Sequence, residues 1–116
     1  RGFGGSTLKD QIYYANDIAL KHNAKQFVIY CGENDFANES NITPEQVFER
    51  FKTFYTLIRN KYPETPIVYI GLKPSPAKLK MMSKIFAYCN RKKYRICRCI
   101  FSHVDARRTT RQWIVF

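Results

Sequence analysis

A short polar segment, Gly32-Glu33-Asn34-Asp35, follows an apolar run at residues 26–30, with Cys31 between them. The run is rich in β-branched and aromatic residues, which predicts a buried strand. In open α/β sheets, ligands bind at the edge where the strands end. The side-chain amide of Asn34 is a neutral donor, which suits a negative charge that forms only during a reaction. The sequence therefore predicts that Asn34 is a functional residue at the carboxyl edge of a sheet.

A glycine-rich segment at residues 1–7 is the second candidate. Ser6 or Thr7 can cap a helix that follows it. The apolar residues of this helix recur at helical spacing through residue 23: Leu8, Ile12, Ala15 and Ala19. A glycine loop that leads into a helix presents backbone N–H groups to an anion. The alternative interpretation is an ordinary tight turn, in which glycine supplies a positive φ.

The elements that must position these two segments alternate between helix and strand. A loop is predicted over Gly32–Ile42, and Thr43 then caps a helix that has Pro44 at its first position and Gln46 able to close a capping box. This helix ends near Tyr62, and its apolar stripe contains Val47, Phe51, Phe54 and Ile58. A second strand is predicted at residues 66–72, and a third helix from about residue 77 to residue 91. The alternation predicts parallel βαβ units with right-handed crossovers.

Composition limits the chain to one globular domain. Its 116 residues are 45% apolar, and no apolar run approaches the roughly 20 residues that span a bilayer. The net charge is +11, and the segment from Arg91 to Gln112 carries +7 of it. Four cysteines lack the regular spacing of a secreted disulfide scaffold: Cys31, Cys89, Cys97 and Cys99. Cys31 and Cys89 lie in apolar patterns and are expected to be buried.

Three motifs, in this order, resemble those of the SGNH (also called GDSL) hydrolase family. They are Arg-Gly-Phe-Gly-Gly-Ser-Thr at 1–7, Gly-Glu-Asn-Asp at 32–35 and Leu-Lys-Pro-Ser-Pro-Ala at 72–77, with a predicted helix and strand between successive motifs. The resemblance covers a partial hydrolase domain at residues 1–93. It implies an α/β fold, a three-layer α/β/α sandwich with a flavodoxin-like parallel sheet, truncated at both ends.

The resemblance also implies a function. Members of this esterase and lipase-like family cleave carboxyl esters, with acetyl or other acyl groups on lipids, sugars or small molecules, and no cofactor is expected here. The backbone N–H of Gly5 and the side chain of Asn34 resemble two donors of the family's oxyanion hole, and the third is the N–H of the nucleophile itself. Asp35 is expected to stabilise its own loop.

The catalytic triad of the family is missing from this chain. The family's serine lies in a Gly-Asp-Ser motif before the glycine loop, and Ser6 and Ser75 are poor substitutes because no histidine or aspartate motif accompanies them. The family's Asp-x-x-His motif is absent, since His103-Val104-Asp105 has the wrong order and spacing. His22 is expected at the surface. We therefore expect a hydrolase fragment that is inactive as written.

The basic tail at residues 94–116 departs from the family. Residues 94–101 permit a strand, but no period follows. One hypothesis is a shifted reading frame: moving the codons of Tyr94–Arg108 by one nucleotide permits Thr-Glu-Tyr-Ala-Asp-Val-Tyr-Phe-His-Met and then Leu-Asp-Glu. The nucleotide sequence tests this, and a frame that runs intact through Phe116, with no downstream Asp-x-x-His in another frame, would end the hypothesis.

Two other interpretations use the same tail. A small nucleic-acid-binding module would use its arginines and lysines beside Tyr94, Phe101 and Trp113. The charge lacks a helical face or a known binding motif, so an ester substrate is the favoured partner over nucleic acid. A zinc site from Cys97, Cys99 and His103 would need a fourth ligand and lacks the usual Cys-x-x-Cys spacing.

Overall fold

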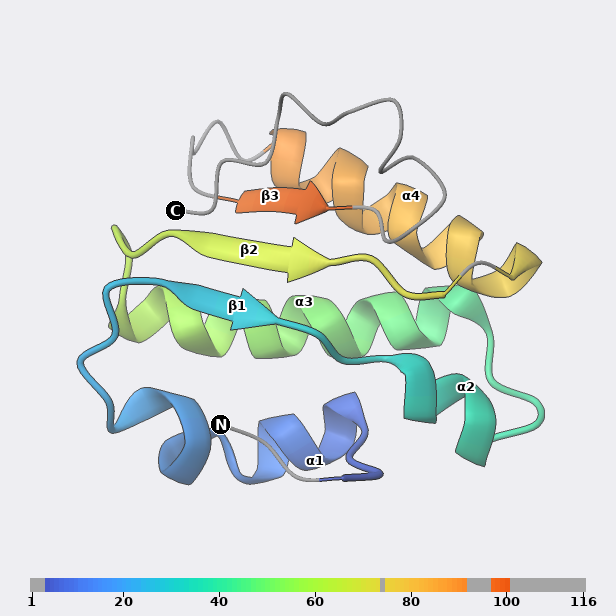
Figure 1. Cartoon of the computed structure of the whole chain (residues 1–116), viewed down its shortest axis with the longest axis horizontal. Coiled ribbons are helices and arrows are strands. Elements are labelled where there is room, and N and C mark those ends of the chain that lie inside the picture. Colours follow the sequence, from blue (N-terminus) through green and yellow to red (C-terminus); the bar gives the residue numbers. More distant parts are fainter. Residues whose placement is uncertain (1–3, 74, 92–96, 101–116) are drawn as a thin grey trace.

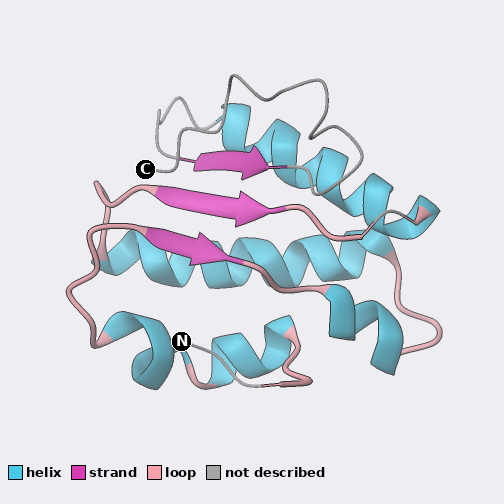
Figure 2. Cartoon of the chain, viewed as in Figure 1, coloured by secondary structure: helices cyan, strands magenta, loops and turns pink. Residues whose placement is uncertain are grey.

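The computed structural model describes residues 4–73, 75–91 and 97–100. Within them, a parallel sheet has the order β1-β2-β3, formed by Phe27–Ile29, Ile67–Ile70 and Cys97–Ile100. Phe27 is opposite Ile67 in the register, and Ile67 is opposite Cys97. The parallel pairing of the two predicted strands is therefore confirmed, although both strands are shorter than predicted. The fold is mixed helix and strand, as Figures 1 and 2 show.

Helices line one side of this sheet. The chain forms α1 (Leu8–Tyr13), the π-helix η1 (Asn16–Leu20), α2 (Glu33–Asn38), α3 (Pro44–Lys61) and α4 (Pro76–Arg91). Helix α3 packs against both α1 and α4, and in Figure 1 it passes behind β1. On β1, Val28 alternates with buried Ile29 and is 56% exposed. One helical layer on the sheet is established, and a second layer stays a prediction.

Helix α3 begins and packs as its sequence predicts. The side chain of Thr43 accepts from the Gln46 N–H (3.2 Å), and the side chain of Gln46 accepts from the Thr43 N–H (2.9 Å). This capping box satisfies two of the backbone donors that a helix N-terminus leaves unpaired. The whole predicted stripe is buried: Val47, Phe51, Phe54 and Ile58. The ring of Phe51 meets Tyr69 of β2 edge to face at 5.1 Å, so α3 is joined to the centre of the sheet.

Two predicted elements differ from the structure. The continuous helix expected through residue 23 ends at Tyr13, and η1 continues the path after a turn in which the Asp17 and Ile18 N–H groups both donate to the Tyr14 carbonyl. The wider π-turn changes the face that each residue presents, and it leaves Ala19 buried. The loop predicted over Gly32–Ile42 instead contains the short helix α2.

Several predictions concern residues outside the described ranges. These include the periodless segment after Phe101, His103, Asp105 and the proposed frame shift. The side chains of Cys97 and Cys99 are also outside what is described, although the backbone of β3 fits the strand that residues 94–101 permit. Among the helices described, none combines the length and apolar character needed to cross a membrane.

Candidate functional site

The two candidate segments meet at the carboxyl edge of the sheet. The Asn34 side-chain Nδ2 donates to the backbone carbonyl of Ser6 at 2.9 Å. Figure 1 shows the start of α1 and the start of α2 together, at the end toward which β1 points. Gly5 precedes Ser6, so its N–H belongs to the same loop that Asn34 contacts. The structure thus brings Asn34 against the glycine loop that the sequence singled out.

The glycine loop is shaped by backbone conformation and by a helix cap. Gly5 is exposed and has φ +75°, a conformation that L side chains rarely adopt. Thr7, not Ser6, is the cap of α1, because the Thr7 side chain accepts from the Asp10 N–H (3.3 Å) while the Asp10 carboxylate accepts from the Thr7 N–H (2.8 Å). The hydrogen bonds from the Thr7 N–H and, second, from the Thr7 hydroxyl hold the pKa of Asp10 below its ordinary value. The hydroxyl oxygen of Ser6 accepts from the Gln11 side chain at 2.9 Å.

Helix α2 begins at a position that only glycine fills without strain. Gly32 has φ +126°, and a Cβ there would lie 3.1 Å from Leu72 Cδ1 and 3.5 Å from Met81 Cε. The chain can therefore leave β1 and turn at once into α2, which places Asn34 in the first turn of that helix. Leu72, in the loop after β2, and Met81, in α4, therefore pack directly against this turn.

Asp35 connects α2 to two other helices. It is fully buried, and its Oδ2 accepts from the Leu8 N–H at 2.9 Å. Its Oδ1 accepts from Arg50 Nη1 of α3 at 2.8 Å, and Arg50 Nη2 also donates to Glu39 at 3.0 Å. A buried carboxylate is tolerated when it is paired and hydrogen-bonded in this way. Asp35 does more than stabilise its own loop, because it also holds the start of α1.

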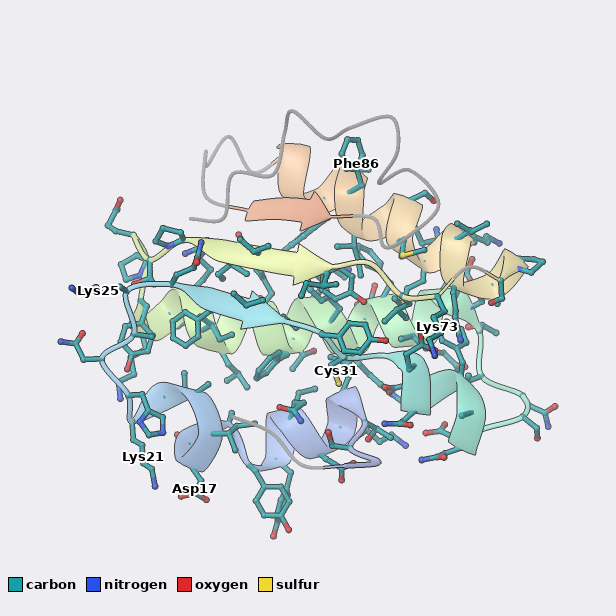
Figure 3. All side chains as sticks on the ribbon, viewed as in Figure 1. Asp17, Lys21, Lys25, Cys31, Lys73 and Phe86 are labelled. Atoms are coloured by element: carbon teal, nitrogen blue, oxygen red, sulfur yellow. The ribbon has the colours of Figure 1, made fainter. Side chains whose placement is uncertain are left out.

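Glu33 makes the corresponding connection on the other side of Asn34. Its carboxylate accepts from the Lys73 N–H at 2.7 Å and from the Lys78 ammonium, and Figure 3 shows Lys73 near the start of α2. Burial pushes the pKa of Glu33 upward. The hydrogen bond from Lys78, the Lys73 N–H and the charges of both lysines outweigh that effect and leave the pKa below its ordinary value. Glu33 is therefore ionised at neutral pH and joins α2 to the loop after β2.

Two hollows flank the contact between Ser6 and Asn34. One, of about 480 Å³, has Asn34 on its wall together with apolar Phe36 and Ile42 and the Glu33–Lys78 pair. The other, of about 380 Å³, follows β1 from His22 and Gln26 to Cys31 and Ser6. Asn34 thus lines the first hollow, and its partner Ser6 lines the second.

An amide nitrogen carries two hydrogens. Asn34 uses one on Ser6, and the second has no acceptor among the residues that the structure describes. The structure places Asn34 against Ser6, and the pairing of its amide with the Gly5 N–H stays a prediction.

No nucleophile and base meet within the part of the chain described. Ser75 Oγ accepts from the Lys78 N–H at 3.3 Å, as a helix cap does. His22 precedes β1 and so lies at the opposite end of the strand from Asn34. A surface position was predicted for His22, but it is half-buried, and its buried Nε2 has no hydrogen-bond partner in the described part of the chain. Cys31 is buried as predicted, and desolvation, followed by the charge of Asp35, raises its pKa to about 12, so it remains a thiol.

Sequence reasoning missed Arg50 and Gln11. Arg50 lies off the apolar stripe of α3, as solvent-exposed residues usually do. Its partner Asp35 is 15 positions away in the sequence, so no local pattern reveals the pair. Gln11 is buried beneath Ser6. The position of Gln11 beside the apolar stripe of Leu8, Ile12 and Ala15 was the sequence feature that could have indicated its burial. No group of three or more potential metal ligands gathers anywhere in the described ranges.

Comparisons of this chain with protein-family models, with curated proteins and with solved structures found no match.

Proposed function

We propose that residues 1–93 are the oxyanion-stabilising part of an SGNH-type serine hydrolase that cleaves carboxyl esters. The observation that carries this proposal is the 2.9 Å hydrogen bond from Asn34 to the Ser6 carbonyl, which holds a side-chain amide donor against the residue that follows Gly5. In the attack of a serine on an ester, the carbonyl oxygen becomes negative. Gly5 N–H and the second N–H of Asn34 would donate to that oxygen.

The hollow along β1 offers a place for the missing nucleophile. Phe27 N–H donates to the Pro66 carbonyl at 2.9 Å, so the peptide groups of Val28 face away from β2 by alternation along the strand. No described strand pairs with that edge. At its far end, His22 Nε2 and Gln26 Nε2 are buried with no partner among the described residues. Unpaired polar groups of this kind are expected to be satisfied by a further segment.

The spacing of the helical layer supports a further strand there. Packed helices lie about 8–10 Å apart, and neighbouring strands lie about 4.8 Å apart. Because α1 packs on the side of α3 away from α4, it extends past the edge strand β1. A strand parallel to β1 and above α1 would end beside Ser6 and Cys31, which line that end of the hollow. A serine at its end would meet a substrate carbonyl held at Asn34, in a flavodoxin-like sandwich.

The other hollow suits the ester substrate. Its wall combines Asn34 with the side chains of Phe36, Ala37 and Ile42, which would contact the apolar part of an acyl group or of the alcohol. The base and its orienting aspartate would come from outside residues 1–93, as would the serine. The chain as written would therefore bind an oxyanion without turning over an ester.

Anion binding by the full 116-residue chain tests this proposal without needing the triad. Methylphosphonate carries tetrahedral, negatively charged oxygens like those of the intermediate. In a nuclear magnetic resonance titration, we expect saturable shifts of the Gly5 N–H and of the Asn34 side-chain amide. Asn34→Ala should abolish the shift at Gly5, whereas Asn38→Ala, an exposed asparagine of the same helix, should leave it unchanged.

The result against the proposal is equally specific. Methylphosphonate that moves only signals of surface lysines, or that binds the Asn34→Ala chain as tightly as wild type, would remove the oxyanion assignment. In a longer polypeptide that supplies the triad, the same substitution should lower turnover by about 10²–10³.

A further inference from the structure

Two adjacent residues of α2 hold Ser6, in the glycine loop, and Leu8, the first residue of α1. Asn34 Nδ2 donates to the Ser6 carbonyl, and Asp35 Oδ2 accepts from the Leu8 N–H, both at 2.9 Å. We propose that Asp35 is a positioning residue, which fixes the glycine loop so that the Gly5 N–H and the free N–H of Asn34 face one oxyanion. This inference rests on the proposed function, since it names what sets the geometry of that same site.

The Asp35 contact controls the direction of the loop. A single hydrogen bond at Ser6 would leave the loop free to rotate about that bond, whereas a second bond two residues later fixes its orientation. The residue between them, Thr7, is committed to the cap of α1 through Asp10. The loop is therefore attached at three successive residues, and only the Asn34 and Asp35 attachments reach across the fold.

Arg50 makes a carboxylate acceptable at this place. An unpaired negative charge next to Asn34 would oppose the negative charge that forms during the reaction. Arg50 Nη1 contacts Asp35 at 2.8 Å, and Arg50 also pairs with Glu39 at 2.9 Å, which holds the guanidinium in place from the exposed side. The hydrogen bonds that Arg50 donates to the two carboxylates raise its pKa, with Glu39 contributing most and burial acting against them. Arg50 thus cancels the charge of Asp35 and lets its oxygen act as an anchor.

The test compares Asp35→Ala, Asp35→Asn and Glu39→Gln in the full chain. Asparagine keeps an oxygen that can accept from Leu8, and Glu39→Gln changes Arg50's other partner without touching the loop. Asp35→Ala should weaken methylphosphonate binding by about tenfold or more, the effect of losing one hydrogen bond to a charged group. Asp35→Asn should retain more of the affinity than Asp35→Ala, and Glu39→Gln should bind like wild type.

A second measurement reports the geometry directly. Without any probe, the Asp35→Ala chain should show faster solvent exchange of the Asn34 side-chain amide and of the Leu8 N–H, because the loop moves away from both. If Asp35→Ala unfolds the chain, Asp35→Asn and Arg50→Gln provide the same comparison. Wild-type affinity and wild-type exchange in the folded Asp35 variants would overturn the positioning role.

The two proposals fail in different ways. If Asn34→Ala abolishes binding while the Asp35 variants bind normally, the positioning role is wrong and the oxyanion site stands. If Asn34→Ala leaves binding unchanged, the oxyanion assignment is wrong, and the positioning role toward an oxyanion is overturned with it. In that case, faster solvent exchange of the Asn34 side-chain amide and of the Leu8 N–H in Asp35→Ala would still show that Asp35 holds the loop in place for a structural reason.

Discussion

Gly32→Ala is the substitution that should most directly displace Asn34. Gly32 lies two residues before Asn34 and has φ +126°. A new Cβ at this position would meet Leu72 Cδ1 at 3.1 Å, Met81 Cε at 3.5 Å and the Tyr69 hydroxyl at 3.6 Å. The change therefore combines backbone strain with crowding of the core. Its consequence should reach both stability and the orientation of α2.

The expected cost follows from those two effects. A non-glycine residue held in a sparsely populated backbone region costs about 1–3 kcal/mol. Overpacking of a well-filled core costs about 1–3 kcal/mol, and the 3.1 Å contact with Leu72 is tight enough that its side chain must shift. The sum is about 2–6 kcal/mol of unfolding free energy. For a chain of this length, the melting temperature should fall by about 10–20 °C.

Two other glycines provide graded controls. Gly4 has no positive φ, and a Cβ there meets nothing within 4 Å, so Gly4→Ala should stabilise by about 0–1 kcal/mol through the unfolded state. Gly5 has φ +75° with open space around it, so Gly5→Ala should cost about 1–2 kcal/mol from the backbone alone.

Urea unfolding of the four proteins, followed by far-ultraviolet circular dichroism, gives the comparison. The predicted order of stability is Gly4→Ala, then Gly5→Ala, then Gly32→Ala. A Gly32→Ala chain as stable as Gly4→Ala would show that the described turn at the start of α2 is wrong. If the prediction holds, the Gly32→Ala chain should also lose the chemical-shift change of the Asn34 side-chain amide on addition of methylphosphonate.

Two further predictions concern ionisable groups at this end of the sheet. Glu33 has a lowered pKa in the folded chain, so its ion pair stabilises the protein above its ordinary pKa of 4.5, and the contribution is lost as pH falls through the lower, folded value. The stability difference between wild type and Glu33→Gln should therefore shrink only in acid; urea unfolding across pH checks this, and a difference that grows as pH falls would contradict it. Cys31, with a pKa of about 12 and a buried side chain, should resist iodoacetamide at about pH 8 in the native chain and react after urea is added. Peptide mass spectrometry would read its modification, and equal rates in both states would show that the thiol is not buried.

Elements with strong local signals could be predicted from the sequence. The start of α3 was predictable because Thr43, Pro44 and Gln46 satisfy the helix terminus among themselves. The strands at β1 and β2 were predictable because each is a short β-branched and aromatic run, although their ends were not, since the outer residues have no partner strand. Asn34 could be proposed because a polar residue directly follows a strand.

Contacts between distant segments were not predictable. Helix α2 has six residues, too few to be stable by itself, so no local pattern reveals it against the loop that the sequence suggests. The break between α1 and η1 depends on which residues must meet α3. Arg50 looks like a surface residue until the fold places Asp35 beside it.

The same dependence explains why Asn34 is so well placed. Because α2 cannot hold its own shape, its conformation is set by partners in three other segments: Glu33 joins it to the loop after β2, Asp35 joins it to α1, and Arg50 joins Asp35 to α3. A change in any of these segments should therefore alter the direction of the Asn34 amide before it unfolds the sheet. The orientation of α2 depends on all three tertiary contacts, and the proposed role of the Asn34 amide therefore depends on them as well.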